Sequence, residues 1–122
     1  MKKILIVDDQ PQIRELVAIT LQLSSYQILL AENGQRAIEI AQTEHPDVIL
    51  LDVMLYGSDL DGLEVCRRLK KNPTTEDIPI VLLTAHGQMS DIEAGKAAGA
   101  DDYFTKPFSP IALMKKIEAV LG

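Results

Sequence analysis

Five polar residues follow or end apolar runs of the sequence, and their types suit metal-assisted phosphoryl chemistry. Asp8 and Asp9 follow the run ILIV, Asp52 ends the run VILLD, and Thr84 and Lys106 end two later runs. Three carboxylates supply the hard oxygen ligands that Mg²⁺ prefers, while a lysine and a threonine hydroxyl can hold phosphoryl oxygens. In such a setting a carboxylate can accept a phosphoryl group, with catalysis by positioning and charge neutralisation.

Each of these residues also has a purely structural interpretation. Asp8 and Asp9 would favour the N-terminus of a following helix, Asp52 can begin a turn, Thr84 suits a strand, and Lys106 can be solvated. The adjacent aspartates nevertheless carry a cost, because ionised carboxylates repel each other and lose hydration beside a core. A helix N-terminus, a cation or exposure to water would offset that cost.

The elements that must position these residues alternate along the chain. Apolar runs rich in β-branched residues predict five strands buried on both faces of a parallel sheet, at residues 3–8, 26–31, 47–52, 78–84 and 101–106. Helical periodicity or capping residues predict five helices, at about 11–21, 34–44, 63–69, 90–98 and 109–121. This alternation predicts an α/β doubly wound domain, whose ligands bind beyond the carboxyl ends of the strands.

Composition narrows the classes of protein to which the chain can belong. Its 122 residues fit one domain, and a net charge of −6 argues against nucleic acid or an anionic membrane as direct partner. Cys66 is the single cysteine, which excludes a disulfide framework and favours a reducing compartment. The apolar run after the first lysines is too short for a secretory signal, and no run approaches the length of a membrane span. We therefore expect a cytoplasmic protein.

Five segments of the sequence resemble the receiver (phosphoacceptor) domain of two-component response regulators. They are ILIVDD, ILLDVML, DGLEVCRRLK, IPIVLLTA and GADDYFTKPF, and they occur in the order of that family across residues 1–122. The resemblance implies a (βα)5 flavodoxin-like fold with a five-stranded parallel sheet of order 2-1-3-4-5. It places the second strand at an edge, away from the site. This agrees with the sequence LLAENG at the end of that strand, to which we assign no role in the site.

The resemblance also implies a role for each polar residue. Asp52 would be the phosphoacceptor, Lys106 would pair with the phosphoryl group, and Thr84 would donate a hydrogen bond to it. The implied Mg²⁺ ligands are Asp9, Asp52 and the backbone carbonyl of Met54, with Asp8 acting through water. The metal would then offset the repulsion between the carboxylates.

Tyr103 lies three residues before Lys106, at the aromatic switch position of the family. It is either a core aromatic or a ring that turns inward when Thr84 moves toward the phosphoryl group. In the second case it would alter the face formed by the fourth helix, the fifth strand and the fifth helix. Cys66 lies on the apolar face of its helix, which predicts a buried structural thiol. His86 lies near the site, and we assign it no catalytic role.

The sequence departs from the family in the loop after Asp52. Tyr56 stands where receivers usually have proline, and the Asp61-Gly62 pair begins nine residues after Asp52 instead of seven. The loop 53–61 is therefore two residues longer than in the family. The resemblance does not define the shape of this loop, but it still implies phosphoryl transfer to Asp52. We expect Asp59, in this loop, to be an exposed turn residue.

These features predict a signalling module whose catalysis is limited to its own phosphotransfer and self-dephosphorylation. The chain lacks a G-x-x-x-x-G-K-[ST] loop for ATP phosphates, so the donor would be a sensor histidine kinase, a histidine phosphotransfer protein or a small acyl phosphate. The expected state is a monomer at rest, with dimerisation on phosphorylation left open. The downstream output is open too, because the sequence fits either a stand-alone receiver or the front of a longer regulator.

Two other classes of protein share parts of this pattern. A phosphatase of the haloacid dehalogenase type also uses an aspartate nucleophile with Mg²⁺, but it carries D-x-D after its first strand and adds a cap domain. Here the first strand is followed by D-D-Q. A flavin-binding protein of flavodoxin-like fold would need a loop rich in Ser, Thr and Gly where Asp8 and Asp9 stand.

The residue two positions after the phosphoacceptor predicts a slow loss of phosphate. The Met54 side chain should lie near the path of a water that attacks the acyl phosphate, and a thioether can neither orient nor deprotonate that water. We expect Met54→Asn to shorten the lifetime of the phosphorylated protein, measured as phosphate loss over time. Rapid loss in the wild type, or an unchanged lifetime in Met54→Asn, would contradict this prediction.

Overall fold

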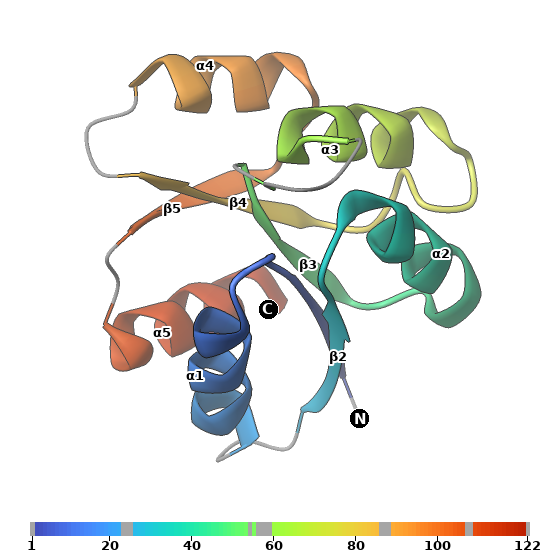
Figure 1. The fold of residues 1–122 in the computed structure, drawn as a ribbon. Helices are drawn as coiled ribbons and strands as arrows, with labels where there is room; N and C mark the ends of the chain where they lie inside the picture. Colours follow the sequence, from blue (N-terminus) through green and yellow to red (C-terminus); the bar gives the residue numbers. More distant parts are fainter. Residues whose placement is uncertain are drawn as a thin grey trace.

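Five parallel strands form one sheet in the order β2-β1-β3-β4-β5 (Figure 1). The computed structural model describes residues 2–22, 26–53, 55, 60–85, 89–106 and 109–121, without the side chains of residues 16, 20–22, 85, 89–91, 106 and 110. The strands are β1 (Lys3–Val7), β2 (Gln27–Ala31), β3 (Val48–Asp52), β4 (Ile80–Ala85) and β5 (Asp102–Lys106). The helices are α1 (Pro11–Gln22), α2 (Gly34–Glu44), α3 (Gly62–Lys71), α4 (Met89–Ala97) and α5 (Pro110–Leu121). The predicted (βα)5 fold and strand order are confirmed.

Helices cover both faces of the sheet and bury β1 and β3 almost completely. Every residue of β3 and all but the first residue of β1 are buried. Helices α2 and α3 lie on one face of the sheet, and α1 and α5 lie on the other (Figure 1). Odd-numbered residues of β1 and β3 pack with α2 and α3, and even-numbered ones pack with α1 and α5. This two-sided burial explains why the apolar runs are nearly continuous instead of alternating.

The two edge strands, β2 and β5, depart from this pattern of burial. In β5, which pairs only with β4, Tyr103 is exposed and Asp102, Phe104 and Thr105 are half-buried. Gln27 and Leu30 are exposed, because β2 pairs only with β1. The prediction that all five strands are buried on both faces was therefore wrong for β2 and β5, while the predicted place of β2 at the edge was right. None of the described helices has both the length and the apolar character needed to cross a membrane.

Local side-chain contacts explain where the helices begin and end. The Ser109 hydroxyl accepts a hydrogen bond from the Ala112 N–H at 3.0 Å and caps α5, as the sequence predicted. Helix α2 ends at Glu44, and His45 follows with a left-handed φ of 44°. Its N–H still donates to the Ala41 carbonyl, which satisfies one of the last helical acceptors.

Register aligns the carboxyl ends of the three central strands. Val7 of β1 lies opposite Leu51 of β3, and Asp52 of β3 lies opposite Leu83 of β4. The residues that follow these pairs therefore share one edge of the sheet. This edge is where open α/β sheets bind their ligands.

Helix α3 begins directly against the end of β3 and depends on a glycine to do so. The Asp61 carboxylate accepts a hydrogen bond from the Glu64 N–H at 2.8 Å and caps the helix. The next residue, Gly62, donates its N–H to the Val53 carbonyl at 3.0 Å. A Cβ atom at position 62 would collide with the Asp52 carbonyl oxygen and lie 2.7 Å from the Val53 Cα. Both neighbours are backbone atoms, so only glycine permits this approach.

We predict that Gly62→Ala lowers the free energy of unfolding by about 1–3 kcal/mol, because the new methyl group must displace backbone. Helix propensity alone would favour alanine over glycine, so the sign of the change separates the two effects. Urea unfolding measures it. As a control, Gln42→Ala on the exposed face of α2 should change stability by less than about 0.5 kcal/mol. A Gly62→Ala protein as stable as the wild type would refute the steric argument.

Candidate functional site

Three carboxylates meet at the carboxyl edge of the sheet. Oxygen atoms of Asp8, Asp9 and Asp52 all lie within 4.8 Å of one another. The pairing of Val7 with Leu51 explains this, because the next residues along the two strands are Asp8 and Asp52. The sequence predicted this cluster from the strand ends, and the structure brings the three residues together.

The cluster is shielded from solvent, and one of its oxygens lacks a partner. Asp8 is fully buried, Asp52 is 5% exposed, and Asp9 is half-buried. In the described part of the chain, Oδ1 of Asp9 is buried and accepts no hydrogen bond. Buried acceptors are normally satisfied, so this atom points to a missing donor or cation. A divalent cation that prefers oxygen ligands fits this donor set.

Hydrogen bonds of the Asp8 N–H, carboxylate and carbonyl oxygen hold the turn between β1 and α1. Its N–H donates to the Ala31 carbonyl at 3.2 Å, and its Oδ1 accepts from the Gln10 N–H at 2.9 Å. Its carbonyl oxygen accepts from Nη1 of Arg14 at 2.6 Å. Helix α1 begins immediately afterwards at Pro11, so its N-terminal dipole also lies near the acidic pair.

Thr84 lies at the same edge, on the strand next to Asp52. It directly follows Leu83, which is opposite Asp52, and the Val53 N–H donates to the Leu83 carbonyl at 3.1 Å. The Thr84 residue is 1% exposed, and its hydroxyl has no hydrogen-bond partner within the described ranges. A buried hydroxyl with no partner can bind a ligand oxygen at this edge.

Lys106 ends β5, where it lies opposite Ala85. Its backbone is therefore at the carboxyl edge, as the sequence predicted, but its side chain lies outside the described part of the structure. Met54, the loop residues Tyr56 and Asp59, and His86 also lie outside the described residues. Their roles remain predictions.

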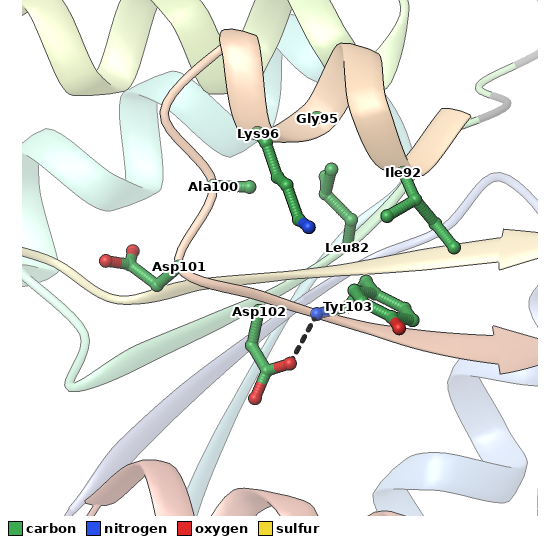
Figure 2. Close-up of a pocket in the computed structure, with 8 residues that line it drawn as sticks. All are labelled: Leu82, Ile92, Gly95, Lys96, Ala100, Asp101, Asp102 and Tyr103. Atoms are coloured by element: carbon green, nitrogen blue, oxygen red, sulfur yellow. Dashed lines mark hydrogen bonds between the residues drawn. The ribbon is translucent and has the colours of Figure 1, made fainter. Parts of the chain in front are cut away.

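Tyr103 is not a core aromatic, because it is 41% exposed. It borders a hollow of about 120 Å³ between β5 and α4, which Leu82, Ile92 and Lys96 also line. Figure 2 shows these side chains around the hollow, with Asp102 directed away from it. The interpretation as a buried core residue is therefore wrong, and a surface role is left for the ring.

Cys66 is a buried structural thiol, as predicted. It is fully buried in α3, and its Sγ lies 3.7 Å from the Ala98 carbonyl oxygen, to which it donates. Burial raises the pKa of the Cys66 thiol to about 11. The thiolate, which is the reactive form, is therefore scarce at neutral pH.

Two residues that shape the site had no assigned role from sequence. Gly62 permits α3 to reach the end of β3, and Arg14 bonds the turn that carries the acidic pair. The glycine had a signal, since it directly follows a helix-capping aspartate. Arg14 had none, because a lone arginine in an amphipathic helix is usually a solvated surface residue.

The sequence model of the response regulator receiver domain matches residues 4–118 of this chain. Similar proteins include the phosphate regulon transcriptional regulatory protein PhoB of Pseudomonas aeruginosa, which is 49% identical over 98% of this chain and 52% of its own length. The alkaline phosphatase synthesis transcriptional regulatory protein PhoP of Bacillus subtilis is 44% identical over 98% of this chain and 48% of its own length. The chain thus spans about half the length of these curated relatives.

Solved structures of similar proteins agree with this match along the whole fold. A putative response regulator from Chloroflexus aurantiacus has a TM-score of 0.92 and 36% identity, covering 98% of this chain and 97% of its own. The chemotaxis response regulator CheY4 of Vibrio cholerae has a TM-score of 0.91 and 34% identity, covering 98% of both chains.

Because the three carboxylates lie so close together, we expect their mutual repulsion to destabilise the metal-free protein. Two unit charges about 5 Å apart repel by roughly 3 kcal/mol at an effective dielectric constant of 20, part of which the surrounding hydrogen bonds offset. We expect Asp9→Asn to raise the free energy of unfolding by about 1 kcal/mol at neutral pH in EDTA. Urea unfolding measures this, with Glu118→Gln on the exposed face of α5 as a charge-matched control. A loss of stability in Asp9→Asn would contradict the prediction.

A divalent cation should stabilise the wild type but not a variant that lacks the Asp9 carboxylate. Millimolar Mg²⁺ is expected to raise the melting temperature of the wild type by mass action and to leave Asp9→Ala unchanged. The absence of any shift in the wild type would count against a metal site at this cluster.

Proposed function

Because the chain belongs to the response regulator receiver domain family, we propose that residues 1–122 form one receiver domain that accepts a phosphoryl group on Asp52. The observation that carries this proposal is the buried carboxylate cluster at the carboxyl edge of the sheet. Asp52 ends the central strand β3, the acidic pair directly follows the neighbouring strand β1, and Thr84 lies in β4 on the other side. It is therefore the carboxylate placed between the metal ligands and the candidate phosphoryl ligands.

The metal proposed for the cluster is Mg²⁺. Asp9 and Asp52 would bind it directly, together with the backbone carbonyl of Met54, and Asp8 would act through water. The partnerless Oδ1 of Asp9 supports this assignment, because a metal bond would satisfy that buried atom. When bound, Mg²⁺ supplies positive charge that neutralises the phosphoryl oxygens during transfer.

Thr84 and Lys106 are proposed to hold the phosphoryl group after transfer. The Thr84 hydroxyl is buried without a partner in the described structure, so a phosphoryl oxygen would be a suitable acceptor. Movement of Thr84 toward that oxygen would leave space for the Tyr103 ring, which borders the hollow beside α4. We propose that this inward turn of Tyr103 changes the α4-β5-α5 face for output.

The phosphoryl donor would be a sensor histidine kinase or a histidine phosphotransfer protein. Receiver domains are signalling modules, so catalysis here would be confined to self-phosphorylation and self-dephosphorylation. The similar PhoB and PhoP proteins are named as transcriptional regulators and are about twice as long as this chain. We propose a cytoplasmic domain that does not itself bind nucleic acid or membranes and is a monomer at rest. Its output then lies in another domain or protein.

The alternative of a phosphatase of the haloacid dehalogenase type is not supported. The receiver family matches residues 4–118, and the nucleophile of that phosphatase class would follow the first strand as D-x-D. Here β1 is followed by Asp8, Asp9 and Gln10, and the proposed acceptor lies at the end of β3.

Acetyl phosphate tests the assignment of Asp52. An Asp52 oxygen should attack the phosphorus, and the bond between phosphorus and the acetyl oxygen should break to release acetate. We predict one added phosphoryl group by intact mass in the presence of Mg²⁺, and almost none in EDTA. The Asp52→Asn variant should remain unmodified because its amide is a poor nucleophile.

A matched variant checks that the result depends on position and not on charge alone. Asp47→Asn removes a carboxylate at the opposite end of β3, where Oδ2 of Asp47 accepts a hydrogen bond from the Lys3 N–H at 2.7 Å. This variant should be phosphorylated like the wild type. Equal labelling of wild type and Asp52→Asn would exclude Asp52 as the acceptor.

A further inference from the structure

Arg14 of α1 contacts the backbone of the acidic turn. Its Nη1 donates a hydrogen bond to the Asp8 carbonyl oxygen at 2.6 Å, across six positions of sequence. The arginine is half-buried. Bonds from a charged donor are shorter and stronger than neutral ones, so this contact is a firm anchor.

The Asp8 carbonyl is well placed to control the direction of Asp9. It belongs to the peptide group whose nitrogen is that of Asp9, and a peptide group is planar. Strand β1 ends at Val7, the last residue of its register with β2 and β3. Beyond that point the Asp8 N–H still donates to the Ala31 carbonyl of β2, and the guanidinium of Arg14 bonds the Asp8 carbonyl, the first carbonyl after the strand.

Two further hydrogen bonds of Asp8 add to this anchorage. Its N–H is tied to Ala31 of β2, and its carboxylate is tied to the Gln10 N–H. The bond from Arg14 fixes the remaining group, the carbonyl, and with it the plane from which Asp9 departs. Oδ1 of Asp9 stays without a partner among the described residues, so Arg14 orients Asp9 without occupying that atom.

We propose that Arg14 is a positioning residue for the carboxylate cluster. By bonding the Asp8 carbonyl, it holds the Asp8–Asp9 peptide in the orientation that presents Asp9 to a divalent cation. The inference rests on the proposed function, because it concerns affinity for the cation that the cluster would bind. In this role Arg14 would act through the Asp8 carbonyl and would not bind the cation itself.

Positioning and simple electrostatics predict opposite effects when Arg14 loses its charge. A cation near the cluster repels Mg²⁺, so removing that charge would tighten Mg²⁺ binding if charge alone mattered. If Arg14 positions Asp9, removing its hydrogen bond weakens binding despite the lower positive charge. Loss of a residue that orients a metal ligand typically lowers affinity about 10–100-fold.

Titration calorimetry with Mg²⁺, without any phosphodonor, measures the dissociation constant directly. We expect Arg14→Gln and Arg14→Met to raise it at least about tenfold, and Arg14→Lys to restore most of the lost affinity. Arg36→Gln is the control for charge, because Arg36 is exposed on α2 and pairs with Glu39 at 3.2 Å. That variant should bind Mg²⁺ like the wild type.

The wild type separates failure of this inference from failure of the proposed function. If the wild type does not bind Mg²⁺, the metal site itself is wrong. If it binds Mg²⁺ and the two neutral Arg14 variants bind equally or more tightly, the positioning role is overturned. The melting temperature in EDTA shows whether each variant folds. One folded neutral variant, Arg14→Gln or Arg14→Met, is enough to test the positioning role. If neither folds, Arg14 stabilises the fold itself and the positioning role is also overturned.

Discussion

Repulsion between three carboxylates is the constraint on which the organisation of this site depends. Oxygens of Asp8, Asp9 and Asp52 lie within 4.8 Å of one another, and two of these residues are almost completely buried. Water cannot relieve repulsion there as it does on a surface. Burial of the apolar residues of β1 and β3 holds the strand ends together against this cost. The stability of the core thus offsets the repulsion and keeps the carboxylates in position to bind a cation and accept a phosphoryl group.

The sheet and its carboxyl edge could be predicted from sequence because both follow from simple patterns. Strands buried on both faces need continuous apolar runs, and helices that cover them need a repeat near 3.6 residues. Asp8, Asp9, Asp52 and Thr84 interrupt the apolar pattern at the points where the strands end. Parallel topology then requires these ends to share one edge, so sequence spacing was enough to group residues that lie far apart in the chain.

The supporting residues could not be predicted because their roles depend on three-dimensional approach. Gly62 matters because α3 meets the backbone of β3, a contact that no local pattern encodes. Arg14 matters because its guanidinium reaches back to the first carbonyl beyond the β1 ladder. The exposure of Tyr103 was similarly undecided, since an aromatic residue within a strand fits both a core and a surface position. The edge position of β2 follows from strand order, which the resemblance to receivers implied and composition did not.

The burial of Cys66 has a practical consequence for observing this protein at work. It is the single cysteine of the chain, it is fully buried, and its pKa of about 11 leaves almost no thiolate at neutral pH. A maleimide dye or nitroxide spin label would therefore react selectively with a second cysteine introduced at an exposed position. Ile111, which is 69% exposed at the start of α5, is one such position. Spectroscopic probes can thus be attached at an introduced cysteine without first removing the native thiol of Cys66.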